Sequence, residues 1–368
     1  MSEEINFANK NTIVNLSNSI LKHFNVPTYH DSIPEIDNLL KGHKKVVVML
    51  FDGMGHNVIR KHLKENSYIR KHYVHMMEAT FPPTTVASTT GFLSAQYPIE
   101  NGWIGWRQYF KKYDTNVLVF PNKNTNTGEV MEDSAIHEVC RYTSIIELIK
   151  KHNKKVNATS IFGKKTYPTG PKNFFRAFLR INKTLKSEYA FTYFYWNQPD
   201  HTLHDEGVDS KKVTKLVKKI NRFVRNITLW NKDTLFLVIA DHGMKDVTMH
   251  HVFEHEDLVK TFARDPSLEG RATAFFVNDE NKEIFESLFN KYYGEHFILI
   301  KSEDALEKGV FGEGQIHKNA RGFFGDYIAI AKDEYAFVLD KTFDFVVKAH
   351  HAGYTKEEME IDISAFNV

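Results

Sequence analysis

The strongest constraint on the fold of this chain is a set of short, uninterrupted apolar runs, several of which end in acidic or histidine residues. Five such runs are present: 46–51 (VVVMLF), 190–196, 234–240, 272–277 and 327–331. A continuous apolar run of this length is typical of a parallel strand that is buried on both faces. Charged segments with helical periodicity, such as Lys211–Leu229, separate the runs. The pattern therefore predicts an α/β fold: a three-layer α/β/α sandwich with a mostly parallel central sheet.

The domain organisation follows from the length and from two segments that break this alternation. A chain of 368 residues is long enough for one large α/β domain. We predict a single catalytic domain over residues 1–368, with inserts near 103–185 and 252–322. The first insert is rich in Lys, Asn, Tyr and Phe and has weaker strand signals, and the second is expected to form a cap or rim.

Composition excludes several classes of function. The net charge is +2, from 48 basic and 46 acidic residues, and gives no reason to expect a nucleic acid or a membrane surface as partner. The single cysteine, Cys140, excludes an intramolecular disulfide and thiolate metal sites. The segment Met1–Phe24 lacks the pattern of a signal peptide, and no apolar run reaches the roughly 18 residues of a membrane span. We predict a cytoplasmic protein with a small-molecule partner.

Acidic and histidine side chains follow three of the apolar runs. Asp52 comes directly after the first run, the pair Asp241 and His242 after the third, and Asp200 and His204 shortly after the second. In an open α/β sheet, ligands bind outside the carboxyl ends of the strands, so these side chains are expected to face one crevice. Each alone also fits a helix cap, a turn or a solvated pair. Together they form a ligand set suited to divalent cations.

Hydroxyl side chains crowd the segment Phe81–Gly91 (FPPTTVASTTG). A hydroxyl at a helix start often caps its own helix, but the same position favours anion binding through free amide groups. A hydroxyl bound to a divalent metal also becomes a competent nucleophile. Spacing alone leaves five candidates open, namely Thr84, Thr85, Ser88, Thr89 and Thr90.

Five separated blocks occur in one order along the chain: VVVMLFDGMG, FPPTTVASTTGFLSAQYPIENG, PDHTLH, IADHGM and HHAGYTKEEM. In this order they resemble the alkaline phosphatase superfamily, and more closely its type I phosphodiesterase and nucleotide pyrophosphatase branch. The resemblance implies an alkaline phosphatase-like fold and a two-metal hydrolase of phosphate esters.

The resemblance also implies roles for individual residues. It selects Thr85 as the nucleophile, which would form a phosphothreonine intermediate. One metal would bind Asp52, Asp241 and His242, and the other Asp200, His204 and His351. His350 stays an alternative to His351, because a shift of one residue exchanges them. The ligands favour two Zn²⁺ ions, with Mn²⁺ as the alternative.

One departure concerns substrate specificity. Where diesterase members carry a phosphate-binding asparagine, this chain has Trp106, so Arg107 or Gln108 is a candidate for the role and an exposed surface arginine is the competing interpretation. We expect a phosphodiesterase or nucleotide pyrophosphatase. The alternatives are a phosphomonoesterase or phosphonate hydrolase of the same superfamily and, in another class, a non-catalytic metal-binding protein.

Overall fold

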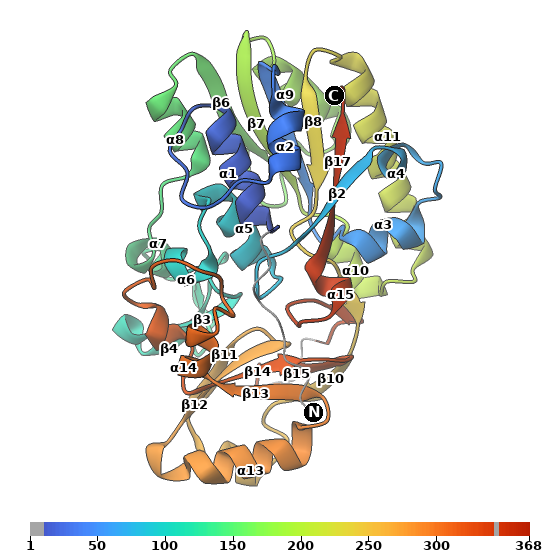
Figure 1. The fold of residues 1–368 in the computed structure, drawn as a ribbon. Coiled ribbons are helices and arrows are strands. Elements are labelled where there is room, and N and C mark those ends of the chain that lie inside the picture. The colour runs from blue at the N-terminus through green and yellow to red at the C-terminus, as the bar shows by residue number, and fades with distance from the viewer. Residues whose placement is uncertain (1–10, 342–345) are drawn as a thin grey trace.

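The computed structural model describes residues 11–341 and 346–368 and is built around a six-stranded sheet (Figure 1). The strand order is β2-β17-β8-β1-β7-β6. The four strands β8, β1, β7 and β6 are parallel, and β17 runs antiparallel to β8 and β2. Their bounds are β1 Lys45–Phe51, β2 Tyr73–Glu78, β6 Val156–Phe162, β7 Tyr189–Trp196, β8 Leu235–Ile239 and β17 Glu360–Phe366. The predicted α/β architecture with a mostly parallel sheet is confirmed.

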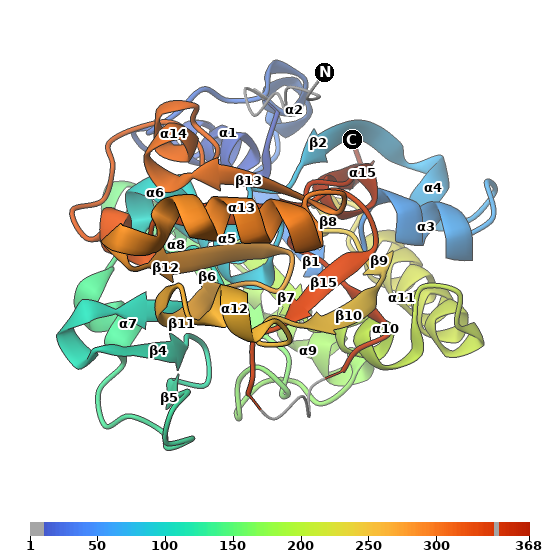
Figure 2. The same cartoon turned by 90° about the horizontal axis from the view of Figure 1, so that it is seen from below.

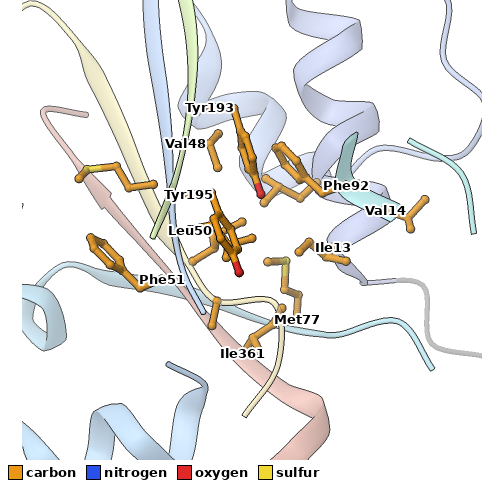
Figure 3. Close-up of a cluster of buried hydrophobic side chains, with 14 of the residues drawn as sticks. Ile13, Val14, Val48, Leu50, Phe51, Met77, Phe92, Tyr193, Tyr195 and Ile361 are labelled. Carbon is orange, nitrogen blue, oxygen red and sulfur yellow. The ribbon is translucent and has the colours of Figure 1, made fainter. Parts of the chain in front are cut away.

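Strand β1 lies at the centre of this sheet because it is apolar on both faces. It pairs with β7 on one side and β8 on the other, and six of its seven residues are buried. Val48 and Leu50 point with Tyr193 and Tyr195 of β7 toward the helices that cover one face (Figure 3). Phe92 of that helical layer stacks on the Tyr193 ring at 5.2 Å between centroids. The runs at 46–51, 190–196 and 234–240 thus form the buried core strands that their pattern predicts.

Helices cover both faces of the sheet (Figures 1 and 2). One layer contains α1 Ile13–His23, α2 Pro34–Leu40, α5 Thr85–Ser94 and α8 Ile145–His152, which contact one another. The opposite layer contains α3 His56–His62, α4 Tyr68–Lys71, α9 Phe174–Thr184, α10 Asp200–Glu206 and α11 Lys211–Trp230. Helix α11 matches the predicted helix Lys211–Leu229 to within one residue. No helix in the described ranges is both long and apolar enough to cross a membrane.

A second, seven-stranded sheet lies below the first in Figure 1 and is antiparallel throughout. Its order is β13-β14-β12-β11-β3-β4-β5. The strands are β3 Arg107–Phe110, β4 Thr115–Leu118, β5 Lys123–Asn124, β11 Phe262–Leu268, β12 Ala272–Val277, β13 Phe297–Lys301 and β14 Tyr327–Ala331. The apolar runs 272–277 and 327–331 are therefore strands of this antiparallel sheet, which corrects their assignment to the parallel one. They are continuous because both faces are buried, one under α13 (Lys282–Tyr293) and its Phe-rich core and the other against the main hydrophobic core.

The two inserts meet in this second sheet. Leu268 of β11 pairs with Arg107 of β3, which joins the segment after 252 to the segment after 103. Part of the first insert belongs elsewhere, because β6 is an edge strand of the main sheet and α8 and α9 flank it. Sequence analysis missed β6 because an edge strand alternates buried and exposed positions and so lacks a continuous apolar run.

Short elements complete the described chain. They are α6 Pro98–Asn101, α7 Ala135–Val139, α12 Glu256–Val259, α14 Ser302–Glu307, α15 Lys356–Met359, β9 Lys245–Asp246, β10 Thr248–His251, β15 Tyr335–Val338 and β16 Ala349–His350. Residues 1–10 lie outside the described residues. The prediction that Met1–Phe24 is not a signal peptide and the predicted start of the domain therefore fall partly outside the described residues. The remainder of that segment forms α1.

A buried ion pair ties the second sheet to the carboxyl-terminal segment. Arg271, at the start of β12, donates two hydrogen bonds to the carboxylate of Glu358 in α15, at 2.6 and 2.7 Å. Both side chains are fully buried. Arg271 also donates to two backbone carbonyls, and Glu358 also accepts from the Gly353 amide at 2.7 Å. The loop that carries His350 and His351 is thereby fixed to the second sheet.

We expect Glu358→Gln to lower the free energy of unfolding by about 3–5 kcal/mol, because it leaves the Arg271 charge buried without a counter-charge. Equilibrium urea denaturation measures this loss. Glu188→Gln is the matched control, since Glu188 and its partner Lys44 are both exposed and that pair is expected to contribute nothing measurable. An equal effect of the two substitutions would contradict the assignment.

Candidate active site

The candidate site lies at the carboxyl ends of the three central strands of the main sheet. Asp52 follows β1, Asp241 follows β8 by two residues, and Asp200 begins α10 after β7. Hydrogen bonds join these loops: the Asp200 amide donates to the Asp52 carbonyl at 2.9 Å, and the Gly53 amide donates to Asp241 Oδ1 at 3.0 Å. The sequence prediction that these carboxylates face one crevice is consistent with this placement.

Two glycines allow the loops to approach this closely. A Cβ at Gly55 would lie 2.4 Å from the Gly243 Cα, so the turns after β1 and β8 pack backbone against backbone. Gly53 has φ +68°, and a Cβ there would lie 2.9 Å from the Asp200 Cα. Any side chain at these positions would push the carboxylate-bearing loops apart.

Three histidines point the same ring nitrogen into the site. In His204, His242 and His351, Nδ1 lies 2.7–2.9 Å from a backbone carbonyl, those of Ala349, Gly243 and Pro83 respectively. A carbonyl only accepts, so Nδ1 carries the proton and the neutral ring offers the Nε2 lone pair to the site. This arrangement is the usual support of a metal-binding histidine, because it fixes both the tautomer and the ring orientation.

The described residues form two groups that can hold a cation. One is Asp200, His204 and His351, and the other is Asp52, Asp200 and His242; within each group the ligand atoms lie within 4.8 Å of one another. Asp200 belongs to both groups, although the resemblance assigns it to one metal. Asp241 Oδ2 lies 3.7 Å from His242 Nε2, beside the second group.

Two carboxylate oxygens in or beside these groups also indicate that a cation can bind here. Asp200 Oδ1 and Asp241 Oδ2 are buried and have no hydrogen-bond partner among the described residues. A buried carboxylate oxygen without a donor is costly unless a cation binds it. These oxygens together with three Nε2 lone pairs form a donor set that suits divalent ions.

The electrostatics of the cluster follow from burial and like charge. Burial, and then the neighbouring charge of Asp200, raises the pKa of Asp52. The pKa of Asp241 is raised well above its usual value by burial and then by Asp52. Burial lowers the pKa of His242, but the charges of Asp241 and Asp52 outweigh it and raise that pKa to about 10. These shifts show that ionised carboxylates are crowded in a buried site, a cost that a bound cation would relieve.

The geometry distinguishes His351 from His350. His351 Nε2 lies 3.8 Å from Asp200 Oδ1, whereas His350 Nδ1 accepts a hydrogen bond from the His351 amide at 2.8 Å. Because its Nδ1 is an acceptor, neutral His350 carries its proton on Nε2 and offers that nitrogen no lone pair. His351 is thus the histidine that joins Asp200 and His204.

Thr85 is the hydroxyl that reaches this cluster. It is the first residue of α5, and its Oγ lies 3.4 Å from Asp52 Oδ1 and 3.3 Å from His242 Nε2. Three competing hydroxyls are engaged elsewhere: Thr84 donates to Glu269, Ser88 bonds Thr80, and Thr89 donates to the Thr85 carbonyl. Thr90, the fifth candidate, is buried within α5.

Two residues that sequence reasoning missed also take part. The Tyr195 hydroxyl donates to Asp52 Oδ2. Glu269 Oε1 accepts two hydrogen bonds of 2.7 Å, one from the Thr84 hydroxyl and one from the Trp106 amide. Burial raises the pKa of Glu269 to about 7. Tyr195 lies inside an apolar strand and Glu269 in the second insert, and neither position carries a pattern that marks it in the sequence.

The two candidates for substrate binding are placed differently. The Gln108 side chain is fully buried, donates to the Gly102 carbonyl and accepts from the Ile104 amide, so it braces its own loop. Arg107 is also buried rather than an exposed surface arginine, and its guanidinium is paired with Asp340. Neither side chain contacts the carboxylate and histidine cluster through any hydrogen bond in the described ranges. These contacts argue against Gln108 as a substrate ligand.

Comparison with known families gives a match over most of the chain. The model of the type I phosphodiesterase / nucleotide pyrophosphatase family matches residues 46–355. The match begins within β1 and ends after His351, so it includes every residue of the two cation-binding groups.

Solved structures show the same fold. The chain is similar to murine ectonucleotide pyrophosphatase/phosphodiesterase 5, with 16% identity, 88% of each chain covered and a TM-score of 0.63. The human protein of the same name gives 16% identity, 88% of this chain, 87% of that chain and a TM-score of 0.63. An inactive variant of the murine protein in complex with AMP gives 16% identity, 88% of each chain and a TM-score of 0.62.

We expect Asp241→Asn to stabilise the metal-free protein and to weaken its stabilisation by metal. The folded-state pKa of Asp241 lies far above the unfolded value of about 4, so this group contributes stability at low pH that is lost as pH rises. Asparagine does not titrate, so in a chelator the melting temperature of the variant should exceed that of the wild type by a margin that grows as the pH rises above about 4.

Excess Zn²⁺ at neutral pH should raise the wild-type melting temperature more than that of the variant, because the variant has lost one anionic oxygen. Thermal denaturation with and without metal measures both effects. A wild type that gains no more from Zn²⁺ than Asp241→Asn would contradict the role of Asp241.

Proposed function

This chain belongs to the type I phosphodiesterase/nucleotide pyrophosphatase family, and from that premise we propose that it cleaves phosphodiesters through a covalent intermediate on Thr85. Membership of the family makes the chain a metal-dependent hydrolase of phosphoric esters. The proposed role of Thr85 as nucleophile rests on the position of its hydroxyl at the start of α5. Its oxygen lies 3.4 Å from Asp52 Oδ1 and 3.3 Å from His242 Nε2.

The proposed reaction has two displacements at phosphorus. The Thr85 hydroxyl gives up its proton as its Oγ forms a P–O bond, and the ester oxygen on the opposite side leaves with its electron pair and takes up a proton from solvent. Water then attacks the same phosphorus, which breaks the bond to Thr85 and restores its hydroxyl. Asp52 accepts a hydrogen bond from that hydroxyl and orients its lone pairs, and the free amides at the start of α5 face the anionic substrate.

Two divalent ions are proposed to bind Asp52, Asp241 and His242 at one position and Asp200, His204 and His351 at the other. When bound, such ions lower the pKa of a coordinated hydroxyl and neutralise developing charge at phosphorus. Donors made only of carboxylate oxygen and imidazole nitrogen favour Zn²⁺, and Mn²⁺ is the alternative. Asp200 supports a close pair of ions, because its carboxylate belongs to both groups.

Nucleotides are the proposed substrates. The Trp106 indole is 41% exposed and contacts Phe120, which is also exposed, at 5.8 Å between ring centroids. The Trp106 amide bonds Glu269, which in turn holds Thr84 beside the nucleophile. These contacts support an aromatic surface on which a nucleobase can stack near the scissile phosphate. The AMP complex of the murine relative gives further support.

A preference for diesters over monoesters is proposed to come from Glu269. Its carboxyl lies against Thr84, the neighbour of the nucleophile, and the fields of His242 and His204 act on it. A phosphomonoester carries a second negative charge above about pH 6, whereas a diester carries one. An ionised carboxyl at this position repels the second charge. This contrast favours the phosphodiesterase over the phosphomonoesterase alternative.

Thr85→Ala is expected to lower kcat on bis-p-nitrophenyl phosphate by about a thousandfold or more, because Thr84, Ser88 and Thr89 bond elsewhere and the Tyr195 hydroxyl is held by Asp52. Thr85→Ser keeps the oxygen and should retain a measurable part of the activity. Chelation should abolish turnover of the wild type, with recovery on adding Zn²⁺ or Mn²⁺. Near-normal activity of the alanine variant would exclude Thr85 as the nucleophile.

Glu269→Gln should lower the ratio of kcat/KM for bis-p-nitrophenyl phosphate to that for p-nitrophenyl phosphate by about tenfold at pH 8, since the amide keeps the acceptor oxygen and loses the charge. At pH 5, where burial keeps Glu269 protonated, the two proteins should have similar ratios. Glu138→Gln, at an exposed carboxylate, is the control. A ratio that does not depend on pH in either protein would argue against charge discrimination.

A further inference from the structure

The charges of this protein are strongly segregated along the chain. Residues 148–187 contain 11 Lys and Arg and no Asp or Glu, and α11 contains 7 Lys and Arg and no Asp or Glu. These two segments hold 18 of the 48 basic residues, so the rest of the chain has 30 basic residues against 46 acidic ones. The net charge of +2 is therefore the balance of a basic region and an acidic remainder.

Much of the basic region folds onto one side of the molecule. Helices α9 and α11 lie together on the face of the main sheet opposite α1 (Figure 2). Phe174 of α9 stacks on Phe223 of α11 at 4.5 Å between ring centroids, and Phe178 contacts Trp230 at 6.0 Å. We call the exposed side of α9, α11 and the loop 163–173 the α9–α11 surface.

The loop and α9 border a groove of about 450 Å³ that has a basic lining. Its side chains include Lys164, Lys172, Arg176, Leu179, Arg180 and Lys183. The cations of this groove are exposed, and none of them forms an ion pair with a described carboxylate. Arg176, Arg180 and Lys183 are spaced four and three residues apart, so they line one side of the helix.

Large apolar side chains are exposed among these cations. Phe175 is 66% and Leu179 45% exposed on α9, and Trp230 is 72% exposed at the end of α11. Phe175 and Leu179 are one turn apart, so they form an apolar stripe beside the basic one. A surface of two adjacent helices that combines exposed Lys and Arg with exposed Phe and Leu on α9 and Trp on α11 fits the interface of an anionic bilayer, where headgroups pair with the cations and acyl chains receive the apolar groups.

We propose that the α9–α11 surface docks this enzyme peripherally on membranes that contain anionic lipids. Nucleic acid is the competing polyanion, but base stacking requires only aromatic rings and leaves the exposed aliphatic Leu179 without a role. If the chain is cytoplasmic, as its sequence predicts, the target is the anionic inner leaflet. Docking of this kind requires no membrane-spanning helix.

The test is binding of the metal-loaded protein to vesicles of phosphatidylcholine alone or with about 30 mol% phosphatidylserine. We expect sedimentation with the anionic vesicles only, and release at about 0.5 M salt. The triple substitution Lys172→Glu, Arg176→Glu and Arg180→Glu should weaken binding by at least about tenfold. Phe175→Ser with Leu179→Ser should weaken it separately, because the apolar stripe is lost.

The matched control reverses three exposed lysines of the second sheet region, Lys123, Lys260 and Lys332, and should keep full binding. Hydrolysis of bis-p-nitrophenyl phosphate in solution and the melting temperature verify that the variants are folded. Equal loss of binding in the control, equal binding to neutral vesicles, or binding of a fluorescent single-stranded oligonucleotide without vesicle binding would each overturn the proposal.

Discussion

The site depends on one electrostatic constraint, the convergence of three carboxylates, two buried and one half-buried, at the ends of adjacent strands. Asp52, Asp200 and Asp241 lie close enough that burial and mutual repulsion raise the pKa of Asp52 and Asp241. Such a cluster persists in a folded protein only if other contacts offset the repulsion between the carboxylates. Here the packing of the loops and the orientation of the histidine rings provide those contacts. Gly55 and Gly243 let the loops touch, and three histidines hold Nε2 toward the carboxylates through bonds from Nδ1 to backbone carbonyls.

The second sheet completes the site from the other side. Its strand β11 leads into Glu269, which holds the Thr84 hydroxyl and the Trp106 amide at 2.7 Å each. Arg271 directly precedes its strand β12 and fixes Glu358 and with it the loop that carries His351. Residues 269–271 therefore contact Thr84 next to Thr85, the backbone of Trp106 and, through Glu358, the loop that carries His351. The loops after β1, β7 and β8 carry the other candidate ligands, and α5 carries Thr85. The second sheet carries residues that contact the loops around them.

Elements with a local sequence pattern were predictable, whereas features that depend on contacts between distant segments were not. The strands at 46–51, 190–196 and 234–240 and the helix at 211 are predictable because continuous apolar runs and helical periodicity are local properties of the chain. The runs at 272–277 and 327–331 have the same local pattern but belong to an antiparallel sheet. Both of their faces are buried, one by α13 and the other by the main core, so their sequences resemble those of parallel core strands. Net charge likewise averages over surfaces that folding separates, so a value of +2 does not reveal the basic segments 148–187 and α11.

The sequence by itself determined the fold class, the strand ends that carry Asp52, Asp241 and His242, and the short segment that contains the nucleophile candidates. Only the tertiary structure shows that the Thr85 hydroxyl lies beside Asp52 and His242 and that the His351 ring, held by the Pro83 carbonyl, faces Asp200. It also brought Glu269 and Tyr195 to the site and placed Gln108 in the interior. These outcomes rest on contacts between segments far apart in the chain, and spacing within one segment carries no information about them.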